Sequence, residues 1–427
     1  MKQKRREFIK ISGLAGITMA SGINGFGMQN NFTTPVASEG AENPSGTSDQ
    51  SIIGAYGPWA ASLMEGKIPA LSYRSPSWKS LDVWKRAARE KLRERMGIPE
   101  LSGLPSVKII KQYEFDGLHV EELTYQLPYG RPTEAVVFKP ANAKGKLPGI
   151  LAFHDHAGNK YLGTGKITRT AGTVPNFIKS HQDTYYEGKA WANEIAKAGY
   201  VVLVSDAFPF ASRRVMLQDV PEKQRFGLTD ADPENVENIK AYNEWAAKHE
   251  QIMAKSLFSA GTTWPGVFFA EDQKALDVLC ARPDVDADRV GCAGLSGGGM
   301  RTVFMGGLDD RIKCAVCVGF MTTWRDLVMN KSYTHTWMTY VPILPRELDF
   351  PEILSLRAPL PTLVQNDNED TLYTLDEMKR ADSILAEVYK KANASDHYSS
   401  RYYPGPHKFD VAMQKDAFAW FDKWLKD

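Results

Sequence analysis

The chain has 427 residues, a formal net charge of +1 and 43% hydrophobic residues. Its length allows one large domain with insertions, or two domains. The near-neutral charge gives no electrostatic reason to expect nucleic acid or an anionic membrane as a partner, and no apolar run in the body of the chain approaches the roughly 20 residues of a membrane span.

The first 28 residues are predicted to be an export signal. Arg5 and Arg6, followed by Phe8 and a mildly apolar stretch with glycines, resemble a twin-arginine signal, although Lys4 stands where that pattern has Ser or Thr. An uncleaved basic anchor is the alternative. Residues 29–50 are predicted to be a flexible linker and residues 51–427 a single domain. The mature protein is then expected to be periplasmic or extracellular, without stable membrane association.

Hydrophobic periodicity predicts strands that alternate with helices. After a helix at 78–100 and a hairpin at 106–127, we expect strands at 135–138, 147–153, 200–206, 289–293, 311–319, 361–366 and 399–403, helices at 184–198, 270–281, 373–391 and 409–426, a helix that begins near 300, and mostly helical insertions at 207–263 and 320–357. Such alternation is typical of an α/β fold with a mostly parallel central sheet and flanking helices.

Four cysteines, Cys280, Cys292, Cys314 and Cys317, are too few for a disulfide scaffold. Cys314 and Cys317 have the spacing of a redox or zinc pair, but they lie in an apolar strand without a second pair. Core packing is therefore the favoured interpretation. A disulfide between Cys280 and Cys292 remains an alternative.

The most informative motif is Gly294-Leu-Ser-Gly-Gly-Gly299. It lies between a buried strand and the start of a helix, which is the context of a nucleophile elbow. Gly294 and Gly298 are expected because a Cβ at either position would strike the neighbouring strand or helix. Ser296 is therefore the predicted nucleophile, and the backbone N–H of Gly297 the first predicted oxyanion donor.

A serine hydroxyl needs a base and a group that orients the base. In this fold they follow the serine in the order acid, then histidine. Asp370 lies just after strand 361–366, and His407 lies in a stiff Pro-Gly-Pro loop before the last helix. Asp367 and Glu369 are the alternative acids, and each of the three carboxylates could instead cap helix 373–391.

The second oxyanion donor is expected from the loop after strand 147–153, as the backbone N–H of His156 or Ala157. His154, Asp155 and His156 also allow a metal-site hypothesis. We favour no metal because no further ligand cluster follows at a convincing spacing. His154 is otherwise expected to form a hydrogen bond beneath the loop.

These blocks, taken as a set, are similar to those of the acetyl-xylan-esterase-like α/β-hydrolases, which are related to dienelactone hydrolase. The matching segments are 154–160, 206–214, 294–299 and 308–323, and the likeness extends over roughly residues 75–425. The resemblance implies an α/β-hydrolase fold, no cofactor, and cleavage of esters on carbohydrate. Glucuronoyl esterases differ, since they carry Arg after the serine where this chain has Gly297.

The candidate substrate-binding residues are His154, Arg213, Arg214 and Trp324. The two arginines could bind a substrate carboxylate or form structural ion pairs, and the second interpretation is favoured. The aromatic residues of 324–340 could stack on a sugar or form the core of their own insertion.

The sequence thus predicts an exported serine esterase that cleaves acyl esters, such as acetyl esters, on polysaccharide fragments without a cofactor. Four alternatives stay open: a peptidase or a lactone hydrolase on the same fold, a metal-dependent hydrolase at His154 and His156, and a carbohydrate-binding protein without activity. The expected partner is a small-molecule or oligosaccharide ester.

Overall fold

The computed structural model describes residues 50–64, 68–230 and 235–426. The predicted signal at 1–28 and nearly all of the predicted linker at 29–50 lie outside these ranges. Within them, the strands are β1 (Val107–Phe115), β2 (Leu118–Tyr125), β3 (Thr133–Pro140), β4 (Leu147–Phe153), β5 (Val201–Ser205), β6 (Val285–Leu295), β7 (Ile312–Val318), β8 (Thr362–Asp367) and β9 (Tyr398–Tyr403).

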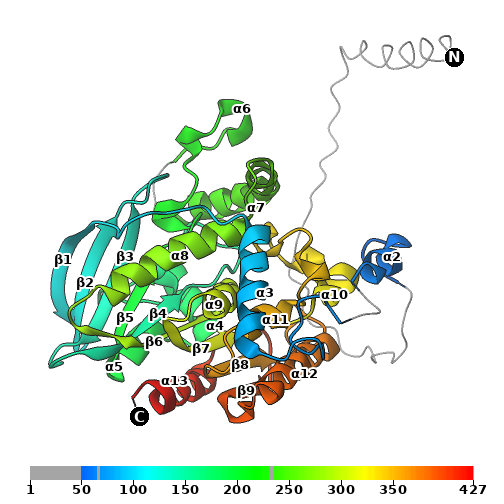
Figure 1. Ribbon diagram of the computed structural model, residues 1–427. Coiled ribbons are helices and arrows are strands. Elements are labelled where there is room, and N and C mark those ends of the chain that lie inside the picture. The colour runs from blue at the N-terminus through cyan, green and yellow to red at the C-terminus, as the bar shows by residue number, and fades with distance from the viewer. Residues whose placement is uncertain (1–49, 65–67, 231–234, 427) are drawn as a thin grey trace, which may run out of the picture. The chain divides into compact units, whose positions relative to one another are not determined.

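These strands form one nine-stranded sheet in the order β1-β2-β3-β5-β4-β6-β7-β8-β9 (Figure 1). The pairs β1–β2, β2–β3 and β3–β5 are antiparallel, and every later pair, from β5–β4 to β8–β9, is parallel. The predicted α/β fold with a mostly parallel sheet is confirmed, and the predicted hairpin is its antiparallel edge.

The α-helices of the described ranges are α2 (Tyr56–Ser62), α3 (Leu81–Met96), α4 (Asn176–Tyr186), α5 (Trp191–Lys197), α6 (Glu222–Arg225), α7 (Val236–Ser259), α8 (Trp264–Cys280), α9 (Gly297–Leu308), α10 (Trp324–Asp326), α11 (Phe350–Ser355), α12 (Leu375–Lys391) and α13 (Val411–Leu425). In these ranges no helix combines the length and apolar character that crossing a membrane requires.

Two predicted helices are wrong in their bounds. The helix expected at 270–281 is α8, which begins earlier, at Trp264, because the side chain of Thr263 caps it there. The segment 184–198 is divided between α4 and α5, because Glu187 and Gly188 take positive φ angles of 52° and 73°. A left-handed residue after the last helical turn ends a helix, and the chain restarts at Trp191.

The core has two halves, one on each face of the sheet. Along β7 successive side chains point to opposite faces, so that Cys314 and Val316 pack in one half and Ala315 and Cys317 in the other. Helices α3, α8, α9 and α12 contribute to the half around Cys317, and α5 and α13 to the half around Cys314 (Figure 1). All four cysteines are free, so Cys280 and Cys292 form no disulfide here, and the buried Cys314 and Cys317 serve as core residues.

The arrangement of strands brings four loops to one edge. Strands β4, β6, β8 and β9 run parallel, so the segments that follow their carboxyl ends meet at the same side of the sheet. The first insertion contributes the long helix α7. The second contributes short helical turns and then α11.

The turn after β6 allows a test of packing. An alanine Cβ at Gly298 would lie 2.5 Å from the carbonyl oxygen of Phe153, whereas a Cβ at the exposed Gly172 would meet no atom within 4 Å. Since overpacking against rigid backbone is costly, Gly298→Ala should lower the free energy of unfolding by about 2 kcal/mol or more, measured by urea denaturation. Gly172→Ala is the matched control and should change it by less than about 0.5 kcal/mol. Equal stabilities of the two variants would contradict this account.

Candidate active site

Ser296 occupies a strained turn between β6 and α9. Its backbone angles are φ 58° and ψ −118°, a conformation that residues with a Cβ rarely adopt. The turn is held by hydrogen bonds from Ser296 N to the carbonyl of Val318 and from Met300 N to the carbonyl of Ser296, both 2.9 Å. The local geometry is that of the predicted elbow, with the serine at its apex.

The glycines beside the serine permit a close approach of backbones. A Cβ at Gly294 would lie 2.6 Å from the carbonyl oxygen of Phe153, the last residue of β4. Because neither Gly294 nor Gly298 has a side chain, the turn rests directly on the end of β4. That contact places the loop after β4 next to Ser296.

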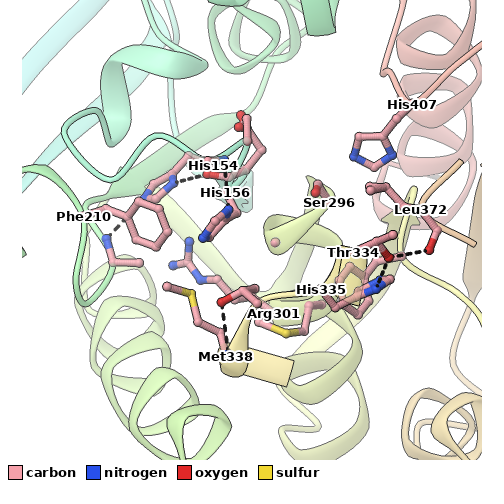
Figure 2. A pocket seen from close by; sticks show the side chains of 18 of the residues that line it. His154, His156, Phe210, Ser296, Arg301, Thr334, His335, Met338, Leu372 and His407 are labelled. Carbon is pink, nitrogen blue, oxygen red and sulfur yellow. Dashed lines mark hydrogen bonds between the residues drawn. The ribbon is translucent and has the colours of Figure 1, made fainter. Parts of the chain in front are cut away.

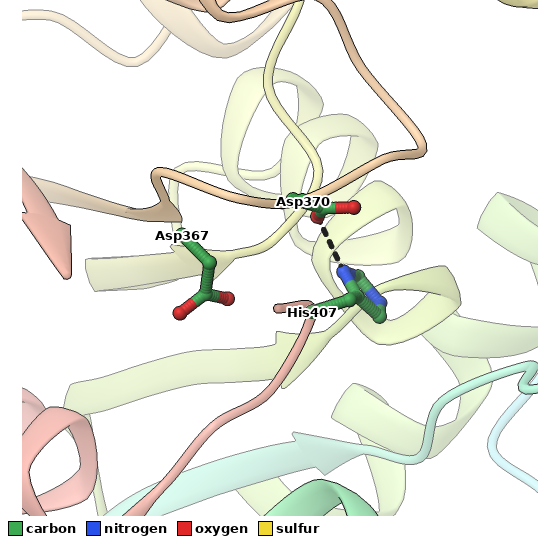
Figure 3. Close-up of side chains that lie close together, drawn as sticks. All are labelled: Asp367, Asp370 and His407. Carbon is green, nitrogen blue, oxygen red and sulfur yellow. Dashed lines mark hydrogen bonds and ion pairs between the residues drawn. The ribbon is translucent and has the colours of Figure 1, made fainter. Parts of the chain in front are cut away.

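Asp370 and His407 form a hydrogen-bonded pair at the same edge (Figure 3). The Nδ1 atom of His407 lies 2.6 Å from Oδ2 of Asp370. Asp370 is buried, and its Oδ1 accepts from the N–H of Leu372 at 2.9 Å. With Nδ1 donating to the carboxylate, Nε2 of His407 is left as an acceptor, and this buried atom has no hydrogen-bond partner among the residues that the structure describes.

The two alternative acids take other partners. Asp367 accepts from the N–H of Lys408 at 3.0 Å, and Glu369 accepts from the N–H of Gly405 at 3.3 Å. Asp367 nevertheless lies near the pair, since its carboxylate, that of Asp370 and the His407 ring each offer an atom within 4.8 Å of the others. Such a group could also hold a cation. Asp370 and His407, however, already use one atom each in the hydrogen bond between them.

The two carboxylates set the charge state of the imidazole. Burial lowers the pKa of His407, but the hydrogen bond to Asp370 and the charges of Asp370 and Asp367 outweigh it, so the pKa is raised above its ordinary value. For Asp367, burial raises the pKa to about 7, although the hydrogen bond from the N–H of Lys408 acts to lower it. The charge on His407 therefore depends on the charge state of both neighbouring carboxylates.

Ser296 and His407 both line a cavity of about 400 Å³ (Figure 2). The structure records no hydrogen bond between the serine hydroxyl and the imidazole. Of the predicted site residues, the cavity also gathers His154, His156, Ala157 and Gly297. Asp370 does not line the cavity and is connected to it through its hydrogen bond with His407.

The predicted oxyanion loop lies beside Gly297. A Cβ on Gly297 would be 3.1 Å from the backbone nitrogen of His156. Ala157 has a positive φ of 42° and Gly158 one of 65°, so the loop turns sharply at this point. The N–H of Gly297 belongs to the first turn of α9 and has no acceptor within the helix.

The histidines of this loop are engaged through all four ring nitrogens. His154 contacts the carbonyl of Asp155 at 3.0 Å through Nδ1 and accepts from the N–H of Ala207 at 3.2 Å through Nε2. His156 accepts from the N–H of Gly158 through Nδ1 and contacts Glu250 at 3.1 Å through Nε2. Their residue types suit a metal, but their nitrogens are already occupied, so the pair does not fit the metal-site hypothesis. His154 lines the cavity and also forms the hydrogen bond expected beneath the loop.

Three predicted substrate-binding residues lie away from the cavity lining. Arg213 is buried and pairs with Glu271 at 2.5 Å. Arg214 stacks its guanidinium on the ring of Tyr161, 4.7 Å from its centroid. Trp324 is buried in the core and donates to the carbonyl of Leu348. A substrate-binding role is corrected for all three. The two arginines take the structural role that the sequence favours, and Trp324 packs in the hydrophobic core.

Sequence reasoning missed other residues of the cavity. Glu250, on α7, contacts Lys160 at 2.5 Å and accepts from the hydroxyl of Thr336 at 2.7 Å, besides contacting His156. His335, which had no supporting context in the sequence, lines the cavity and packs against Tyr373. No local motif marks Glu250 or His335, because both lie in insertions.

Arg301 was also missed, although it lies in the elbow helix only five positions after the serine. It pairs with Asp272 through two contacts of 2.5 and 2.9 Å. Its guanidinium lies 4.3 Å from the ring centroid of Phe153. In Figure 2 it forms part of the cavity wall. The signal that could have found it is helical spacing, which puts a residue four after Gly297 on the same side of α9.

Comparisons with known proteins agree with this fold. The model of the prolyl oligopeptidase family matches residues 259–358, which include the elbow. A Bacillus subtilis (strain 168) protein named "Putative hydrolase YtaP" is 26% identical over 323 residues, covering 75% of this chain and 93% of the relative.

Two solved structures share the architecture. A protein described as a putative acetyl xylan esterase from Bacteroides fragilis is 19% identical, covers 83% of this chain and 84% of its own, and superposes with a TM-score of 0.60. A glucuronoyl esterase from Solibacter usitatus is 14% identical, covers 85% and 99%, and has a TM-score of 0.58. The resemblance seen in the sequence is thus confirmed at the level of fold: the chain has the α/β-hydrolase fold.

Proposed function

We propose that this protein is a serine hydrolase that cleaves carboxylic esters, with acyl esters on carbohydrate fragments as its substrates. The observation that carries the proposal is the combination of Ser296, at the apex of a strained turn, with a His407–Asp370 pair whose free Nε2 lies at the same cavity. A nucleophile, a base and a group that orients the base are the parts that acyl transfer needs.

In this mechanism the hydroxyl of Ser296 attacks the carbonyl carbon of the ester while Nε2 of His407 accepts its proton. Asp370 holds the ring through Nδ1 and stabilises the imidazolium that forms. The N–H groups of Gly297 and of His156 or Ala157 donate to the negative oxygen of the tetrahedral intermediate. The alcohol leaves with the proton from His407, and water then releases the acid from the acyl-enzyme by the reverse sequence. Apart from the substrate and water, the steps use side chains and backbone of this chain, without a cofactor.

The carbohydrate part of the proposal has separate support. Solved structures with the same fold include proteins described as acetyl xylan and glucuronoyl esterases. The predicted twin-arginine signal would place the enzyme outside the cytoplasm, where polysaccharide fragments are found. A peptidase is the second candidate, because the matching family model is that of prolyl oligopeptidases.

Ser296→Ala should reduce the turnover of p-nitrophenyl acetate by at least about 10³-fold, because the variant lacks the nucleophile. A fluorophosphonate probe should label the wild type and leave Ser296→Ala unlabelled. Ser332→Ala, at a serine outside the cavity lining, should keep both properties. Equal rates for wild type and Ser296→Ala would overturn the proposal, and glycan binding without any labelling would favour a binding protein.

The substrate class is tested by three parallel assays of the wild type. Acetylated xylo-oligosaccharides should be deacetylated with a kcat/KM at least about tenfold above that for a prolyl peptide amide, because an alkoxide is a better leaving group than an amide nitrogen. A lactone is the third substrate. Faster cleavage of the peptide would favour the peptidase, and exclusive cleavage of the lactone a lactone hydrolase.

The charges around His407 predict the pH dependence. The base must be neutral, so kcat/KM should rise with pH through a midpoint above the ordinary histidine pKa of about 6.5. Asp367→Asn removes a nearby negative charge, which destabilises the imidazolium, so the midpoint should move down by about 0.5 pH unit or more. The exposed Asp396 supplies the control, and Asp396→Asn should leave the midpoint in place. A midpoint that stays or rises in Asp367→Asn would contradict the electrostatic argument.

A further inference from the structure

Lys166 is a fully buried lysine beneath the proposed oxyanion loop. It ends the short 3-10 helix Thr164–Lys166, and none of its surface is exposed. Its ammonium group donates to two consecutive backbone carbonyls, that of Asp155 at 2.7 Å and that of His156 at 3.0 Å. A buried charge is costly unless it is paired. Its counter-charge is the carboxylate of Asp155, 3.8 Å away.

Each of these carbonyls also has a second contact, that of Asp155 with Nδ1 of His154 at 3.0 Å and that of His156 with the N–H of Asn159 at 2.9 Å. The bonds from Lys166 therefore act together with these contacts in setting where the next N–H groups point. A trans peptide unit is planar, and its C=O and N–H point in opposite directions. The carbonyls of Asp155 and His156 both face the ammonium group. The N–H groups of His156 and Ala157 must therefore both face away from it.

The side they face is that of the serine turn. The backbone nitrogen of His156 lies beside Gly297, within 3.1 Å of where a Cβ of Gly297 would be. The positive φ of 42° at Ala157 is the left-handed conformation that makes successive N–H groups converge into an anion-binding concavity. No backbone hydrogen bond within the described residues uses the N–H of His156 or of Ala157.

We propose that Lys166 is a positioning residue for ester hydrolysis. It holds two consecutive peptide groups so that the N–H groups of His156 and Ala157 both join that of Gly297 in stabilising the oxyanion. The inference rests on the proposed function and extends it. The oxyanion hole then has three N–H donors, and the ammonium group of Lys166 holds two of their peptide groups from the carbonyl side. A cation on the carbonyl side also polarises each peptide group, which makes its N–H a stronger donor.

The surroundings of Lys166 suit this role. Asp155, its counter-charge, is itself held by His181 at 3.0 Å and by the hydroxyl of Tyr186. The ammonium group also lies 4.8 Å from the ring centroid of Phe210. The lysine therefore has little room to move, and among the described residues its ammonium group donates hydrogen bonds to these two loop carbonyls.

The test compares Lys166→Met with Arg357→Met in the full-length protein. Arg357 is also fully buried and also donates to backbone carbonyls, those of Leu360, Pro361 and Ile312, but it lies outside the cavity lining. Both variants lose a buried cation that braces backbone, so both should lower Tm. A purely structural role would reduce the two activities alike.

The readouts are kcat and KM for p-nitrophenyl acetate and Ki for an aryl trifluoromethyl ketone, which adds to the serine as a tetrahedral oxyanion. Because the loss of one oxyanion donor typically costs 10²–10³-fold in kcat, Lys166→Met should lower kcat at least about 30-fold, weaken Ki by a similar factor and change KM less than about threefold. Arg357→Met should keep kcat and Ki within about threefold. If Lys166→Met does not fold, Lys166→Arg and Lys166→Gln replace it. The arginine, which keeps the charge and several donors, should then exceed the glutamine in kcat and in affinity for the ketone.

Three outcomes would each overturn the role of Lys166 while leaving the esterase proposal intact. They are an unchanged kcat in folded Lys166→Met, a loss of kcat in Arg357→Met equal to that in Lys166→Met, and equal activities of Lys166→Arg and Lys166→Gln. If instead the wild type does not exceed Ser296→Ala in turnover, the proposed function fails, and the role of Lys166 fails with it.

Discussion

The site depends on one close contact between backbones, that of the turn after β6 with the end of β4. The contact exists because Gly294 and Gly298 have no side chain, and a Cβ at either would lie 2.5–2.6 Å from the carbonyl oxygen of Phe153. It brings the loop that begins at His154 next to the serine. The strained backbone of Ser296, which costs free energy, persists because strands and helices on both sides hold it.

Buried charges then hold the surrounding segments in place, and one carboxylate connects both insertions to the loop. Glu250 comes from the first insertion and contacts Thr336 of the second as well as His156 and Lys160 of the loop. Burying such charges is expensive, and removing one partner leaves the other uncompensated. These ion pairs therefore determine where the segments lie more than they add to the free energy of unfolding. They hold the two insertions in place relative to the loop after β4.

Much of the site could be predicted from the sequence because its requirements are local. The elbow needs glycines at set offsets from Ser296, and that pattern is readable without any knowledge of the fold. Asp370 and His407 could be predicted from their places after successive strands, since parallel strands bring their carboxyl ends to one edge. The order of strands and helices followed from hydrophobic periodicity for the same reason, with an error where Glu187 adopts a left-handed conformation.

The rest was decided only by tertiary structure. The choice of Asp370 over two neighbouring carboxylates depends on which oxygen reaches the imidazole, a distance of 2.6 Å that no spacing encodes. Arg213 and Trp324 left the candidate site, and Glu250 and His335 entered it, because each lies in or beside an insertion without a repeating pattern. By itself the sequence determined the parts that a turn or a strand end positions through short-range sterics. The residues that line the rest of the cavity could be identified only from the tertiary structure, because the direction of a side chain there depends on packing partners tens of residues away.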